Sequence, residues 1–129
     1  MSGRVVHFEV PFDDEGRARD FYGDVFGWQT TSLPELGGYV IVSTGPTEDM
    51  SGPTEPGFIN GGMFKRQAPV ESPAITIDVD DIDAALEQVV AHGGKVIEPR
   101  QAVGDMGFTG YFSDSEGNTV GLWQTAPGG

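Results

Sequence analysis

The chain has 129 residues, of which 37% are hydrophobic and 10% aromatic, as expected for one folded domain spanning residues 1–129. Its 20 acidic and 7 basic residues give a net charge of −13, which opposes binding to nucleic acid and to anionic membranes. This charge is typical of a highly soluble protein, and it would also attract a cationic ligand. There are no cysteines, which excludes disulfides, thiolate nucleophiles and zinc–thiolate sites.

The sequence predicts neither a secretion signal nor a membrane span. The first ten residues, MSGRVVHFEV, lack the long apolar run that follows the basic residue of a signal peptide. No stretch approaches the roughly 18 consecutive apolar residues of a transmembrane helix. We therefore expect a cytoplasmic protein whose partners are neither nucleic acid nor membrane.

The sequence repeats itself once. The segment HFEVPFDDEGRARDFYGDVFGW, from His7, aligns without a gap with AITIDVDDIDAALEQVVAHGGK, from Ala74. In this alignment Asp14 meets Asp81, and a glycine follows the predicted helix in both segments. Each half is therefore predicted to contain a strand, an acidic helix cap, a helix, a glycine stop and further strands.

Hydrophobic periodicity defines the first half. Apolar residues alternate with His7 and Glu9, which predicts a half-buried strand. Asp13 and Asp14 are placed to cap the next helix, and Gly27 is placed to end it. The helix has one apolar stripe with i, i+3, i+4, i+7 spacing, formed by Ala18, Phe21, Tyr22 and Val25.

The second half follows the same pattern. In its first strand, Ile75, Ile77 and Val79 alternate with Ala74, Thr76 and Asp78. Asp80 and Asp81 provide the cap, and Gly93 and Gly94 follow the helix. The apolar stripe of this helix contains Ile82, Ala85, Leu86, Val89 and Val90. His92 lies in the last turn, where we interpret it as structural or exposed.

The remaining residues predict strands joined by turns. Strands are expected at 38–43, 58–65, 95–98, 107–113 and 118–124, with a turn at 114–117. Residues 44–57 are rich in Gly, Pro, Ser, Thr and acid and predict a mobile loop. A linker is expected at 67–73 and a frayed tail at 125–129.

The predicted fold class is α+β, with two tandem βαβββ modules at about 5–66 and 72–125. The helix of each module is expected to cover the apolar face of its strands. The two modules would form an open, cup-shaped mixed sheet. The cup would be lined by the residues of the opposite strand face: His7, Glu9, Ala74, Thr76 and Asp78.

Three segments resemble proteins of the vicinal oxygen chelate superfamily, which includes glyoxalases, bleomycin-resistance proteins and dioxygenases. The first segment, HFEVPFDDEGRARDFYGDVFGW, is similar to their first strand and helix, which end in FY-x-x-x-x-GW. The segment VDDIDAALEQVVAHGGKV is similar to their second helix. The segment DSEGNTVGLWQ is similar to their closing turn and strand, usually D-P-x-G-N. The resemblance covers about residues 5–125 and implies the same fold and a homodimer.

The resemblance does not extend to the metal ligands of the family. Enzymes such as glyoxalase I commonly bind one divalent metal through His or Gln on the first strand, Glu on the fourth, His on the fifth and Glu on the last. His7 matches the first position. The others fall on Gly61 (or Gly62 if the register slips), Ala74 and Gly121, which have no donor atoms. Because a catalytic metal needs about three protein ligands, we expect no metal and no cofactor.

The candidate ligand-binding residues are those expected in the cup: His7, Glu9, Trp28, Thr76, Tyr111 and Trp123. Two interpretations of His7 stay open, a polar residue hydrogen-bonded to Glu9 or a neighbour, and a ligand-binding or acid–base group. The aromatic residues would equally suit core or dimer packing. Gly61, Gly62 and Gly121 would leave room for a bulky ligand or a neighbouring backbone. Arg66 could bind a ligand carboxylate or lie on the surface.

Two classes of function follow. The first is a metal-free small-molecule-binding protein, such as a relative that sequesters an antibiotic. The alternative is an enzyme of lyase, isomerase or oxygenase type that acts on a small oxygenated metabolite, with His7 and Glu9 as acid–base groups. A metal-dependent lyase and a regulatory partner module are weaker alternatives. The fold alone does not decide between them.

Overall fold

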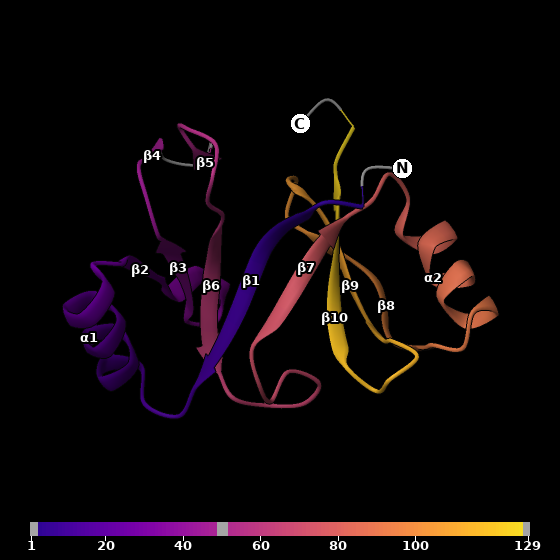
Figure 1. Ribbon diagram of the computed structural model, residues 1–129, viewed down its shortest axis with the longest axis horizontal. Helices are drawn as coiled ribbons and strands as arrows, with labels where there is room; N and C mark the ends of the chain where they lie inside the picture. Colours follow the sequence, from indigo (N-terminus) through magenta and orange to yellow (C-terminus); the bar gives the residue numbers. More distant parts are fainter. Residues whose placement is uncertain (1–2, 49–51, 128–129) are drawn as a thin grey trace. The chain divides into compact units, whose positions relative to one another are not determined.

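The computed structural model describes residues 3–48 and 52–127, and its contacts divide the chain into two units. The first unit is His7–Pro73, and the second joins the residues up to Val6 to those from Ala74 onward. Each unit combines one α-helix with a mixed sheet (Figure 1). The two predicted βαβββ modules and the α+β class are therefore confirmed.

The first unit has a four-stranded sheet in the order β2-β3-β6-β1. Strand β3 is antiparallel to both β2 and β6, and β6 is parallel to β1, which begins two residues before the unit. The elements are β1 (Val5–Phe12), α1 (Glu15–Phe26), β2 (Gln29–Leu33), a 3-10 turn (Pro34–Leu36), β3 (Tyr39–Ser43), β4 (Thr47–Glu48), β5 (Gly52–Pro53) and β6 (Asn60–Lys65).

The second unit repeats this topology in the order β7-β10-β9-β8. Strand β10 is parallel to β7 and antiparallel to β9, and β9 is antiparallel to β8. Its elements are β7 (Ala74–Asp78), α2 (Ile82–Ala91), β8 (Lys95–Val103), β9 (Gly107–Ser113) and β10 (Thr119–Thr125). The repeat in the sequence is thus a repeat of the same strand order and directions.

Both helices begin at the predicted aspartates. The side chain of Asp14 accepts a hydrogen bond from the backbone N–H of Arg17 (2.9 Å). Asp81 does the same for Ala84 (3.2 Å). These bonds satisfy N–H groups that have no partner within the helix. Helix α1 ends at Gly27, whose left-handed conformation (φ 75°) favours glycine.

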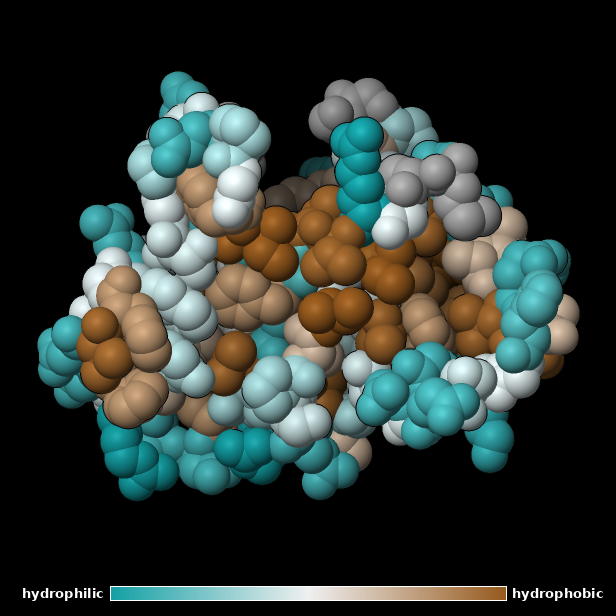
Figure 2. All heavy atoms as spheres, in the orientation of Figure 1, coloured by the Kyte–Doolittle hydropathy of each residue, from teal (hydrophilic) through white to brown (hydrophobic). Residues whose placement is uncertain are grey.

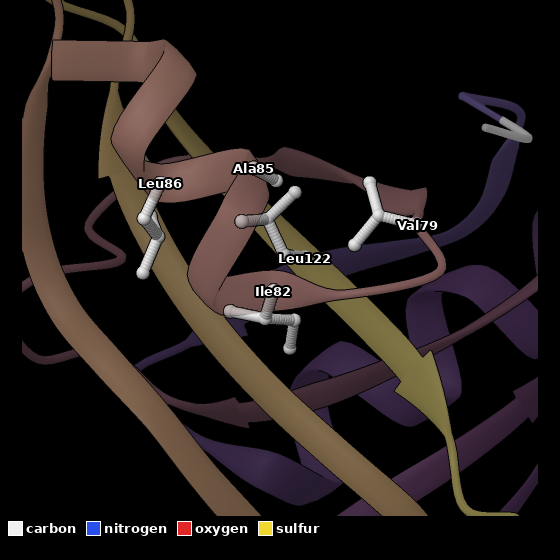
Figure 3. Close-up of a cluster of buried hydrophobic side chains, with 5 residues drawn as sticks. All are labelled: Val79, Ile82, Ala85, Leu86 and Leu122. Carbon is white, nitrogen blue, oxygen red and sulfur yellow. The ribbon is translucent and has the colours of Figure 1, made fainter.

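The core of the second unit lies between α2 and its sheet. Figure 3 shows Ile82, Ala85 and Leu86 of α2 beside Leu122 of β10 and Val79, and all five side chains are buried. The partly buried residues packed against them are Ile77, Phe108 and Phe112. Ile75 was predicted to face this helix, but it is 45% exposed and does not pack against this cluster, whereas Ile77, two residues further along β7, does.

The core of the first unit contains buried residues from three strands and partly buried residues from β1, α1 and the segment after it. The buried residues are Phe12, Val40, Val42 and Met63, and Phe8, Val10, Ala18, Tyr22 and Trp28 pack against them. The predicted stripe of α1 is only half covered, since Phe21 is 55% and Val25 56% exposed. Figure 2 accordingly shows apolar side chains on the surface over α1.

Three local predictions need correction. The predicted loop 44–57 contains the short antiparallel strands β4 and β5, while residues 49–51 lie outside the described residues. The strand predicted at 95–98 continues to Val103, because two register shifts let it follow β9 past Pro99. In the predicted tail, Thr125 belongs to β10 and the N–H of Ala126 donates to Met106. No helix in 3–48 or 52–127 is long and apolar enough to cross a bilayer.

Candidate ligand-binding site

Strand register in the first unit brings His7 and Glu9 onto the same face of the sheet as Gly62. Glu9 pairs with Gly62 of β6, and Gly62 pairs in turn with Ile41 of β3. The alternate residues of β1, including Phe8, pack into the core beneath α1. We call the opposite side of this sheet the His7 face. This face carries His7, Glu9, Pro11, Tyr39, Ile41, Gly62 and Phe64.

Tyr39 is the partner of His7 on this face. The Nε2 atom of His7 lies 2.9 Å from the Tyr39 hydroxyl, within hydrogen-bond distance. The ring of Tyr39 also lies edge-on to Phe64, with centroids 6.0 Å apart and planes at 89°. Tyr39 was not among the residues predicted for the site. Alternation with the buried Val40 would have placed it on the polar side of its strand, but only the strand pairing brings that strand near His7.

Gly62 provides the space for the Tyr39 phenol. A Cβ atom at Gly62 would collide with the hydroxyl and the adjoining ring carbons of Tyr39. Gly61 faces the other way, where a Cβ would meet the backbone oxygen and ring of Phe8. The room that was predicted here for a bulky ligand or a neighbouring backbone is occupied by the Tyr39 side chain at Gly62 and by the backbone and ring of Phe8 at Gly61.

Burial controls the protonation of the site. Desolvation by burial lowers the pKa of His7 below 6.5, so the imidazole is neutral at pH 7. Burial, and then the nearby charge of Glu9, raises the pKa of Tyr39 above its usual range, so the phenol keeps its proton. Glu9 is only 8% exposed. The His7 face thus combines two neutral hydrogen-bonding groups with one carboxyl group.

The second unit carries a related arrangement. Gly121 of β10 pairs with Thr76 on one side and with Tyr111 on the other. A Cβ atom at Gly121 would lie 3.1 Å from the Thr76 hydroxyl and 3.3 Å from the Tyr111 ring. Trp123 is two residues further along the same strand and donates its Nε1 hydrogen to the Thr125 hydroxyl (3.0 Å). Thr76, Tyr111 and Trp123 therefore share one face of this unit.

Trp28 lies apart from the other predicted residues of its unit. Its ring stacks on Tyr22, with centroids 4.5 Å apart and planes at 8°, and lies 5.4 Å from Phe8. These contacts place Trp28 in the core under α1, on the opposite side of the sheet from His7 and Glu9. The structure therefore matches the core-packing interpretation of this residue.

Arg66 and His92 make local contacts. The Nε atom of Arg66 lies 3.0 Å from an oxygen of Asp13, and its Nη1 atom donates to the Glu71 carbonyl. The Nδ1 atom of His92 lies 2.9 Å from the carbonyl of Gln88, one turn back in α2. These contacts fit the surface interpretation of Arg66 and the structural interpretation of His92.

Comparison with known proteins identifies the family. A model of the bleomycin resistance protein-like N-terminal region matches residues 4–45. A glyoxylase-like domain-containing protein of Didymella fabae is 32% identical over 133 residues, covering 99% of this chain and 98% of that protein. The chain belongs to the vicinal oxygen chelate superfamily.

Two further vicinal oxygen chelate relatives show the extent of the similarity. A Mycobacterium tuberculosis protein named as a glyoxylase, CFP32, is 35% identical over 115 residues, which cover 86% of this chain. The chain spans only 41% of the length of that protein. A glyoxalase/bleomycin resistance/dioxygenase superfamily member from Vibrio splendidus has the same fold. Its structure has a TM-score of 0.60 at 17% identity, with 95% of this chain and 98% of that chain covered.

The residues present do not fit the metal of vicinal oxygen chelate enzymes. The strand register assigns the fourth-strand ligand position to Gly62, which shares the face of His7. Of the four family positions, only His7 carries a donor atom, because Gly62, Ala74 and Gly121 have none. The space beside Gly62 is filled by Tyr39, which also engages Nε2 of His7. Across residues 3–48 and 52–127, no three His, Asp or Glu side chains are grouped to hold a metal ion.

Proposed function

We propose that this protein is a small-molecule-binding member of the vicinal oxygen chelate superfamily that works without the family's metal. The observation that carries the proposal is the position of Tyr39, whose phenol fills the space above Gly62 and is hydrogen-bonded to His7. In this arrangement the histidine of the first strand is hydrogen-bonded to a phenol and is not a ligand of a metal ion. A ligand would then be bound by hydrogen bonds and apolar contacts alone.

Each unit carries its own set of proposed binding residues. In the first unit they are His7 and Glu9, as predicted, together with Tyr39. In the second unit they are Thr76, Tyr111 and Trp123, which share one face of its sheet. Trp28 is left out because it packs in the core. We further propose a homodimer in the cytoplasm, as the family resemblance and the composition led us to expect.

Metal analysis combined with a ligand screen tests this function. The purified protein, untreated and soaked with nickel, zinc, manganese or iron, should hold far less than one metal per chain. Fragments found by ligand-observed NMR should bind equally well with and without a chelator. About one metal per chain that is lost in His7→Ala and kept in the matched variant His92→Ala would contradict the proposal.

One observation favours the alternative of an enzyme. Glu9 is buried on the same face as a neutral imidazole and a neutral phenol, which resembles a general base beside hydrogen-bond donors. Such an enzyme would act on a small oxygenated metabolite. Turnover that is lost in Glu9→Gln, while ligand affinity is kept, would support it. Ligands that bind tightly and are recovered unchanged would support the binding function.

A further inference from the structure

We propose that the ligand of the His7 face is an uncharged, flat aromatic molecule that carries a hydroxyl or carbonyl oxygen, and that Tyr39 is the residue that selects it. This inference rests on the proposed function and adds the chemical class of the ligand. It is carried by three features of the first unit: its apolar surface, its hydrogen-bonding capacity and its charge.

The apolar surface surrounds the phenol. Phe64 meets the Tyr39 ring edge-on, and its strand pairing places it opposite Pro11. Ile41 lies opposite Gly62 on the other side. Because Gly62 has no side chain, the Tyr39 ring lies directly over it and forms part of this apolar surface. Aromatic and aliphatic side chains gathered on one face favour a flat ring, which gains most from stacking and edge contacts.

The hydrogen-bonding capacity comes from Tyr39. A phenol has one donor and two acceptor positions, and His7 occupies one of these three. Burial keeps both groups neutral, so they bind an oxygen by hydrogen bonding and not by charge. A ligand hydroxyl or carbonyl matches the capacity that is left on the phenol.

The charge of the face opposes anionic ligands. In the described part of the first unit, the strand register places no lysine or arginine on the His7 face. Arg19 instead bonds Glu15 and Thr30, while Lys65 and Arg66 bond Asp13. A carboxylate or phosphate would therefore lose its hydration near the Glu9 carboxyl group, and no lysine or arginine of these described strands would replace it. This feature separates neutral ligands from anionic ligands of the same shape.

Two matched probes, 2-naphthol and 2-naphthoate, test the inference. Their dissociation constants would be measured from amide shifts of the ¹⁵N-labelled full chain. We expect 2-naphthol to shift amides of β1, β3 and β6 and to bind at least about ten-fold more tightly than 2-naphthoate. Tyr39→Phe should weaken the binding of 2-naphthol about five-fold. Tyr22→Phe, the control on the other side of the sheet, should leave the dissociation constant of 2-naphthol unchanged. Glu9→Gln should reduce the ratio between the dissociation constants of the two probes.

The outcomes separate this inference from the proposed function. Equal or tighter binding of 2-naphthoate, shifts confined to other strands, or full affinity in Tyr39→Phe would overturn the ligand class and leave a metal-free binding protein standing. If neither probe binds the folded chain, the ligand class is wrong. If the fragment screen also yields no ligand, the proposed function fails with it.

Discussion

Gly62 lies beneath the phenol of Tyr39 so closely that a single added methyl group would occupy the position of the hydroxyl. The glycine stands where the family resemblance places a metal-binding glutamate on the fourth strand. The tyrosine comes from the neighbouring strand β3 and reaches His7 across the glycine. One missing side chain therefore explains both the loss of a metal ligand and the position of the phenol.

We predict that Gly62→Ala destabilises the protein by about 1–3 kcal/mol, because the new methyl group and Tyr39 need the same space. Urea unfolding measures the change. Gly16→Ala is the matched control, since its Cβ would meet only ordinary contact distances at the start of α1. In the Tyr39→Ala background, Gly62→Ala should cost much less. An equal cost in both backgrounds would mean that the glycine serves another purpose.

The histidine predicts a dependence of stability on pH. The pKa of His7 is lower in the folded chain than its ordinary 6.5, because burial opposes the charged imidazole. Below pH 6.5 the unfolded chain therefore takes up this proton more readily, and stability falls as the pH drops toward the folded pKa. His7→Asn should lose less stability than the wild type over this range. An NMR titration of the His7 ring with a midpoint at or above 6.5 would contradict the prediction.

Trp28 should matter for stability and not for binding. Its ring packs between Tyr22 and Phe8, so Trp28→Ala should lower the free energy of unfolding by about 3 kcal/mol. The affinity for 2-naphthol, measured at a temperature where the variant stays folded, should be unchanged. A large loss of affinity in the folded variant would instead make Trp28 a ligand-binding residue, which was the other interpretation of this aromatic residue.

The helix caps offer a direct test of the repeat. Asp81→Ala should cost about 1 kcal/mol, because the N–H of Ala84 loses its side-chain acceptor. Asp14→Ala should cost a similar amount in the other unit, where Arg17 donates the bond. The Asn variants keep an acceptor oxygen and should lose only a few tenths of a kcal/mol. Thermal unfolding compares the two series, and equal losses for Ala and Asn would point to charge as the stabilising factor.

The sequence by itself determined the repeat, the two capped helices and the α+β class. These depend on local rules: alternation along a strand, the apolar spacing of a helix and the acceptors that a free helix end requires. The capping role of Asp14 and Asp81 could be predicted for this reason, since each side chain accepts a hydrogen bond from an N–H group only three residues away. The same rules placed Thr76 and Trp123 on one face, because residues of equal parity share a side of a strand.

Only the tertiary structure decided the composition of the candidate site. Tyr39 is 32 residues from His7 in the sequence, and the two meet because β3 and β1 both flank β6. The pairing of β1 with β6 also chose Gly62 over Gly61 for the His7 face, since a shift of one residue reverses the side of every side chain. Trp28 was assigned to the core by its contacts with Tyr22 and Phe8. Each of these results depends on strand register and on packing between distant segments. Alternation within a single strand predicts neither of them.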